Sequence, residues 1–292
     1  MSATATCTVT KPAASNDAGD VFEKLNARVE RKTKQMIAMH AEGKADLPPE
    51  VECVQRPMTA LWCGTPVYVA RNLFVTYALM VIGALCIAHG VKECGLPCAL
   101  VCFAATYIIY DAYSGVLHVM LDDPKNLRLP ILGQPCLEFQ WHHHIPDDIV
   151  LKPFIECCAD LNFAVGANFA VHFFTSAKLG ANPVIILLLG CKMLSAYFGQ
   201  FSHRCAHMGL SQRGALITGL QKTGIMTTFA QHRVHHTPPH DSNFCLLGPC
   251  NSMVQSLKNM IPNTEAWLLV FFTWTIFDIS LIAAGIGCLF GA

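Results

Sequence analysis

The stretch NLFVTYALMVIGALCIAHGV, residues 72–91, contains 20 consecutive residues without Asp, Glu, Lys or Arg. A helix of about 20 apolar residues is long enough to cross the roughly 30 Å hydrocarbon layer of a bilayer. The composition of the whole chain agrees, because 53% of its 292 residues are hydrophobic and only 14% are charged, against about 25% charged in a typical soluble domain. The sequence therefore predicts an integral membrane protein.

Further apolar segments of similar length follow this first one. They predict an all-α membrane bundle of about four to five transmembrane helices, whose later spans cover residues 94–121, 161–177, 179–202 and 267–290. Three of these spans contain a charged residue, namely Asp111, Lys192 and Asp278. Ionisable groups inside a bilayer are costly and often functional.

The segment before the first span is polar. Residues 1–66 are predicted to form a mobile N-terminal tail with one surface helix, and residues 67–292 the membrane domain. The formal net charge is zero and no block of like charge stands out, so the sequence lacks the basic footprint of a nucleic-acid-binding protein. The 15 cysteines are scattered through apolar stretches, which favours small buried side chains over a disulfide scaffold.

The order of the spans places the long polar segments on one side of the membrane. If the second span ends near His118 and the next two form a hairpin, the 122–160 loop and the 203–265 segment share a face with the tail. Of the 20 Lys and Arg residues, 17 fall in these three segments, and only Lys92 and Lys178 fall in the opposite loops. The positive-inside rule then predicts a cytosolic or stromal face. We expect an endoplasmic reticulum membrane, with a plastid membrane as the alternative.

Histidines gather on this predicted face. Eleven of the 13 histidines lie between residues 118 and 240. Ten of these form four clusters, HVMLD (118–122), WHHHIP (141–146), HRCAH (203–207) and HRVHHTPPH (232–240). Residues three or four apart share a face of a helix, and neutral imidazole is the commonest metal ligand. The clusters therefore predict a metal centre at the membrane surface.

The number and type of side chains restrict this metal centre. No C-x-x-C pair accompanies the histidines, which argues against a structural zinc site, and so many imidazoles are too many for one ion. Imidazole alone leaves iron, copper, zinc and nickel open. A histidine cage above an apolar bundle suits a pair of irons that reduces dioxygen and removes hydrogen from an unactivated carbon of a lipid chain.

Five segments between residues 110 and 251 carry a resemblance to a known family. They are SGVLHVMLD (114–122), FQWHHHIPDDIVLKPFIE (139–156), HRCAH (203–207), GLQKTGIM (219–226) and QHRVHHTPPHDSNFC (231–245). This layout resembles the Kua-type lipid desaturases, which include plasmanylethanolamine desaturase and the plant plastid desaturase that acts on phosphatidylglycerol. The last segment is the most specific, because its spacing and its non-histidine residues both match.

The resemblance implies two iron ions and a set of ligands. The implied ligands are His118, His142, His143, His203, His207, His232, His235 and His236, with Asp122, His144 and His240 as further candidates for a ligand or a second-shell partner. The triple histidine leaves the register within residues 142–144 open by one position. No catalytic side chain beyond the metal ligands is implied.

The implied reaction is the introduction of a double bond into an alkyl or acyl chain of a glycerophospholipid. It uses O2 and external electrons, since the chain carries no flavin, nicotinamide or haem motif, and a cytochrome b5 or a ferredoxin is the expected donor. A di-iron lipid hydroxylase fits the same cage. A non-enzymatic metal transporter or sensor is a third hypothesis, and it predicts polar residues spread along the spans rather than gathered at one surface.

Overall fold

The computed structural model describes residues 72–123, 146–176 and 182–290, together with residues 126, 132, 135, 136, 139, 142 and 143 of the intervening loop. The predicted tail with its surface helix, and His144, lie outside these residues. All the regular elements within the described ranges are helices, so the all-α prediction is confirmed there.

The first helix, α3 (Leu73–Leu121), is a broken one. Its 49 residues would extend about 74 Å as a straight helix, more than twice the thickness of the hydrocarbon layer. The break lies at Gly95, where φ is 77° and ψ is 163°, a conformation that glycine adopts without steric cost. Pro97 follows two residues later and cannot donate a helical hydrogen bond. α3 therefore consists of two segments, residues 73–94 and 96–121, close to the two predicted spans.

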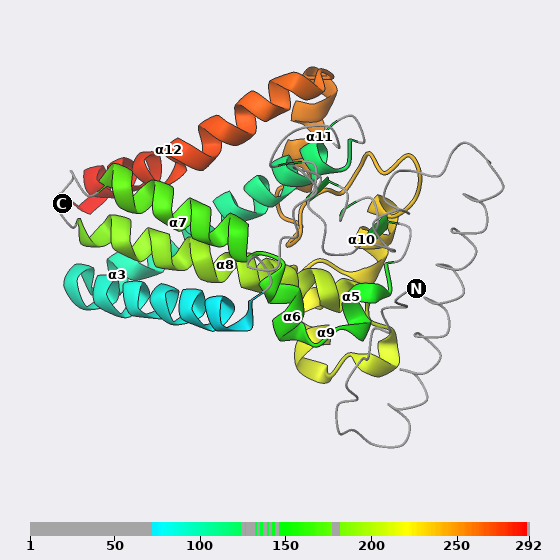
Figure 1. Ribbon diagram of the computed structural model, residues 1–292, viewed down its shortest axis with the longest axis horizontal. Helices are drawn as coiled ribbons and strands as arrows, with labels where there is room; N and C mark the ends of the chain where they lie inside the picture. Colours follow the sequence, from blue (N-terminus) through cyan, green and yellow to red (C-terminus); the bar gives the residue numbers. More distant parts are fainter. Residues whose placement is uncertain are drawn as a thin grey trace, which may run out of the picture.

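The two segments of α3 lie against the long helix α8 (Pro183–His207). Gly83 in the first segment packs against Leu194 of α8. Seven residues later, Gly90 packs against Leu187, so this segment runs antiparallel to α8. Figure 1 shows the chain reversing at the left end of the molecule and the second segment running back toward the other end. Glycine allows the close approach, because a Cβ atom at Gly90 would lie 2.4 Å from the Cβ of Leu187.

The bundle is completed by α7 (Asn162–Ser176) and α12 (Thr264–Phe290). Within the described residues, α3, α8 and α12 are long and apolar enough to cross a membrane. α7 has 15 residues, about 22 Å of helix, and begins one residue after the start of the predicted span 161–177, whose last residue lies outside the described residues. Large apolar side chains such as Phe74, Leu269 and Leu281 are exposed on the outside of the bundle, as expected for surfaces that contact lipid rather than water.

The shorter helices gather at one end of this bundle. They are α5 (Asp148–Leu151), α6 (Phe154–Ala159), the 3-10 turn η4 (Leu210–Gln212), α9 (Ala215–Lys222), α10 (Phe229–His235) and α11 (Asn251–Met260). In Figure 1, α5, α6, α9 and α10 lie at the right of the view, and the C-terminal end of α12 lies at the left. The last turns of the second α3 segment and of α8 therefore point into the region where these short helices meet.

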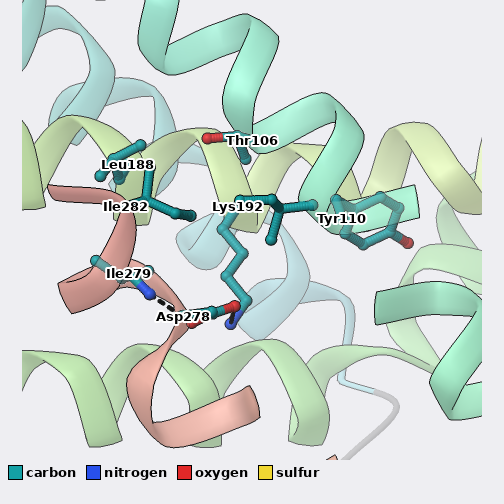
Figure 2. A pocket seen from close by; sticks show the side chains of 8 residues that line it. Thr106, Tyr110, Leu188, Lys192, Asp278, Ile279 and Ile282 are labelled. Atoms are coloured by element: carbon teal, nitrogen blue, oxygen red, sulfur yellow. Dashed lines mark hydrogen bonds and ion pairs between the residues drawn. The ribbon is translucent and has the colours of Figure 1, made fainter. Parts of the chain in front are cut away.

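Two of the three charged residues of the predicted spans pair with one another inside the bundle. The ammonium Nζ of Lys192 lies 2.6 Å from Oδ2 of Asp278, and Nε2 of His172 lies 3.4 Å from Oδ1 of the same carboxylate. Figure 2 shows Lys192 and Asp278 meeting beside a small cavity that Thr106 and Tyr110 also line. One polar cluster thus joins α7, α8 and α12.

Candidate metal centre

A first group of five imidazoles gathers where α8, α10 and the 122–160 loop meet. Their potential ligand nitrogens all lie within 4.8 Å of one another, and the members are His142, His203, His207, His232 and His236. Nε2 of His207 is central to the group. It lies 2.9 Å from Nε2 of His232, 3.0 Å from that of His142 and 3.3 Å from that of His203. Three segments far apart in the sequence therefore direct nitrogen donors at one point.

A second, smaller group lies beside the first and consists of Asp122, His143 and His235. The two Nε2 atoms are 3.1 Å apart, and each lies 3.5 Å from one carboxylate oxygen of Asp122. His118 lies between the two groups, with its ring centroid 5.2 Å from that of His235 and 6.2 Å from that of His203. The structure thus brings all eight predicted histidine ligands together and adds Asp122 to the smaller group.

Local helix geometry accounts for these positions. His203 and His207 are one turn apart at the C-terminal end of α8, so they share a face. α10 has only seven residues, but it begins with a capping box in which Thr228 and Gln231 satisfy each other's backbone N–H groups. The cap fixes the start of the turn from which His232, His235 and His236 project.

Backbone carbonyls orient two of the rings. Nδ1 of His118 lies 2.8 Å from the carbonyl oxygen of Ser114, and Nδ1 of His235 lies 3.1 Å from that of Ser242. Because a carbonyl can only accept, Nδ1 must donate, which leaves the lone pair on Nε2 facing the other rings. Such a bond from the second ring nitrogen is typical of metal-ligating histidines.

His240 occupies a supporting position. Its ring stacks on that of His143 with centroids 4.5 Å apart and planes inclined by 12°, and its Nδ1 lies 3.0 Å from the carbonyl oxygen of His235. It belongs to neither group of potential ligands. His240 therefore contacts one member of the smaller group and the backbone of another.

The electrostatics of the site suit a bound cation. Burial, reinforced by the neighbouring imidazoles, holds the pKa of His142, His232 and His235 well below the ordinary histidine value, so these rings are neutral, which is the form that binds metal. Burial also raises the pKa of Asp122 well above its ordinary value, with Lys258 acting in the opposite sense. A metal ion beside Asp122 would supply the positive charge that stabilises its carboxylate.

Arg204 was not among the predicted site residues, and it supports the segment that follows His142 and His143 in the chain. Its guanidinium donates to the carbonyl oxygens of Ile149, Val150 and Lys152, at the C-terminal end of α5. These are carbonyls that a helix end leaves without an intrahelical donor. The sequence signal that could have identified Arg204 is its position directly after His203, near the end of the helix that carries two of the predicted ligands.

Asp111 also has a supporting role and does not join the metal-ligand groups. Its carboxylate accepts backbone N–H groups from Leu247 at 2.8 Å, Gly248 at 3.0 Å and Cys250 at 2.8 Å. The neighbouring Ser114 hydroxyl accepts from the N–H of Leu246 at 3.0 Å. The loop that follows α10 is thereby tied to α3.

Gln221, in the predicted GLQKTGIM element, ties α9 to α8 and to the start of α10. Its side-chain amide donates to the carbonyl oxygens of Cys205 at 3.4 Å and Thr227 at 3.0 Å, and its Oε1 accepts from Arg213 at 2.8 Å. The GLQKTGIM element therefore holds α8 and the start of α10 in place and supplies no metal ligand.

A family described as the lipid desaturase domain matches residues 107–272, which include both groups of potential ligands. The chain belongs to the lipid desaturase family. This confirms the resemblance to the Kua-type enzymes. The lipid desaturase domain begins inside the second α3 segment and ends inside α12, so it takes in the end of α3 that carries His118, all of α7 and α8, and the short helices.

Relatives from three kingdoms share part of this chain. Fatty acid desaturase 4, chloroplastic, from Arabidopsis thaliana is 29% identical over 203 residues, covering 69% of this chain and 58% of the relative. Plasmanylethanolamine desaturase 1 from Mus musculus is 26% identical over 158 residues, covering 51% and 57%. Plasmanylethanolamine desaturase from Myxococcus xanthus is 24% identical over 161 residues, covering 54% and 56%. The matches thus span less than two thirds of each of these relatives, and no solved structure matches this chain.

Proposed function

We propose that this protein is a membrane-bound di-iron lipid desaturase that introduces a double bond into an alkyl or acyl chain of a glycerophospholipid. The observation that carries the proposal is the two adjacent groups of imidazoles at one end of an apolar helical bundle, within the lipid desaturase domain. The names of the relatives, fatty acid desaturase and plasmanylethanolamine desaturase, support a lipid chain as substrate.

Two iron ions fit the donors that these groups offer. The five imidazoles of the first group would hold one ion, and Asp122, His143 and His235 would hold the other, with His118 placed to serve either. Neither group contains a cysteine, and imidazole with carboxylate suits iron better than it suits a structural zinc site. His240, stacked on His143, is assigned an orienting role.

The side chains of the site would hold the iron ions and orient one another, and no side chain acts as a nucleophile. When bound, the iron pair supplies the redox chemistry, in which O2, two electrons and two protons, with two hydrogens from adjacent carbons of the chain, give a double bond and two waters. His118 and His235 keep their Nε2 atoms free of protons through the bonds from Nδ1 to backbone carbonyls. The electrons would come from a partner, a cytochrome b5 or a ferredoxin.

The proposed orientation places the metal centre at the cytosolic or stromal face. The two α3 segments, α8 and α12 would span the bilayer, and α7 would form a shorter fifth membrane helix. The excess of Lys and Arg in the segments flanking the site supports this orientation. An endoplasmic reticulum membrane is proposed, with a plastid membrane as the alternative.

The test compares cells that express the wild-type chain with cells that express His236→Ala. His89→Ala is the matched control, because His89 is an exposed histidine of α3 that belongs to neither group. We expect two irons per purified wild-type chain and a new unsaturated or vinyl-ether lipid that the control retains and His236→Ala loses. A hydroxylated lipid instead would establish a hydroxylase, and bound zinc without any lipid change would refute the proposal.

A further inference from the structure

Helix α9 and the turns beside it present apolar side chains outward. Leu210 in η4 is 81% exposed and Leu216 in α9 is 76% exposed, whereas Gln221 of the same helix is 6% exposed. A helix at a water-facing surface shows the opposite arrangement, with its leucines inside and its amides outside. The buried Gln221 is satisfied by hydrogen bonds to Cys205, Thr227 and Arg213, so the inversion is part of a well-bonded structure.

The depth of this surface follows from its contact with α3. The Tyr107 hydroxyl donates to the carbonyl oxygen of Ile225 at 3.0 Å, in the turn that follows α9. Tyr107 lies 11 residues before His118 on the same helical segment, which corresponds to about 16 Å along the helix axis. The N–H of Thr227, two residues after Ile225, donates to the hydroxyl of Ser202 at 3.2 Å, next to His203. The turn after α9 therefore extends from the level of the metal centre toward the level at which α3 is apolar.

At this level the exposed surface of α3 is apolar as well. Ile108, next to Tyr107, is 47% exposed, and Phe103, which lies farther from the metal centre on the same helical segment, is also exposed. Ile225, whose carbonyl Tyr107 contacts, is 42% exposed. The outward side chains of Leu210, Leu216 and Ile225, here called the α9 face, thus continue the apolar surface of a predicted membrane span.

We propose that the α9 face is embedded among the acyl chains of the leaflet on the metal-centre side, so that α9 is an interfacial membrane helix. The exposed Lys222 at the C-terminal end of α9 has a side chain long enough to reach lipid headgroups from that depth. Lipid is favoured over a second copy of the chain because the α9 face is continuous with the lipid-facing surface of α3. The proposal concerns where the protein contacts the bilayer, so it stands or falls separately from the proposed reaction.

The experiment uses the full chain in nanodiscs made with phosphatidylcholine brominated on its acyl chains, which quenches nearby tryptophan. Leu216→Trp and, independently, Leu210→Trp place a reporter on the α9 face at exposed positions where the larger ring has room. Phe103→Trp on α3 is the lipid-facing reference, and Thr237→Trp, on the exposed polar turn after α10, is the water-facing reference. The four native tryptophans are a constant background that is subtracted with the parent protein.

We expect the added fluorescence at residues 216 and 210 to be blue-shifted and strongly quenched by the brominated lipid, as for Phe103→Trp, and little affected by iodide in the buffer. Quenching by iodide but not by brominated lipid, as expected for Thr237→Trp, would overturn the proposal. Protection from both quenchers would also overturn it, because a second copy of the chain or another protein segment would then cover the face.

Discussion

Arg204→Lys is the substitution that tests how the larger group of imidazoles is held. Nη1 of the guanidinium donates to the carbonyl oxygens of Ile149 and Lys152, and Nη2 donates to that of Val150. A lysine ammonium has a single nitrogen, so it can replace Nη1 but cannot also make the bond from Nη2. Hydrogen bonds from charged groups contribute about 1.5–3 kcal/mol each. One lost bond gives a cost of roughly 2 kcal/mol. This loss of free energy would destabilise the loop that carries His142 and His143.

A penalty of about 2 kcal/mol corresponds to roughly a 30-fold loss of metal affinity if it falls on the metal-bound state. We expect this loss in an anaerobic titration of the metal-free protein with Fe2+ or Co2+ against a competing chelator. The melting temperature of the metal-free protein should change little. Arg233→Lys is the matched control, because Arg233 also follows a predicted ligand directly but is exposed. Wild-type affinity in Arg204→Lys would refute the positioning role.

Three further substitutions test other parts of the structure. Lys192→Met leaves the buried Asp278 carboxylate without its cation, so it should lower the free energy of unfolding by about 3–5 kcal/mol, measured by thermal unfolding in detergent. The double variant Lys192→Met with Asp278→Leu should recover most of this stability. An equal loss of stability in both variants would contradict the pairing. Asp122→Asn weakens the smaller group and should lower the iron content from two per chain toward one by elemental analysis, whereas two retained irons would remove Asp122 from the ligands. Asp111→Asn replaces one of the two carboxylate oxygens that accept three backbone N–H groups with an amide nitrogen, which cannot accept. The substitution should lower the free energy of unfolding by about 2 kcal/mol and increase hydrogen exchange in residues 246–250. Unchanged exchange would show that other contacts hold this loop.

Helix breaks and histidine spacing were readable from the sequence because both depend on local chemistry. The spans predicted at residues 72–91 and 94–121 place a break close to the observed one at Gly95, which lies one residue inside the second predicted span. The turn spacing of His203 with His207 placed both rings on one face before any packing was known. The gathering of the clusters at one end followed from counting the spans, and the structure places their members within a few ångströms of one another.

The features that could not be predicted depend on contacts between distant segments. Lys192 and Asp278 are 86 residues apart, and each alone is only a costly charge in a span; their pairing requires the packing of α8 against α12. Arg204 binds backbone carbonyls, which leave no signature in the sequence of the partner segment.

The carbonyl oxygens that orient His118 and His235 have a consequence for how the protein can vary. A point substitution replaces a side chain, but it leaves the main-chain oxygen at residue 242 in place to accept from His235. The direction of this imidazole is thereby insulated from most mutations of its immediate support. Residues around the site can therefore be substituted while the His235 ring keeps its orientation. In a mutational scan, substitutions of Ser242 should reduce activity far less than substitutions of His235.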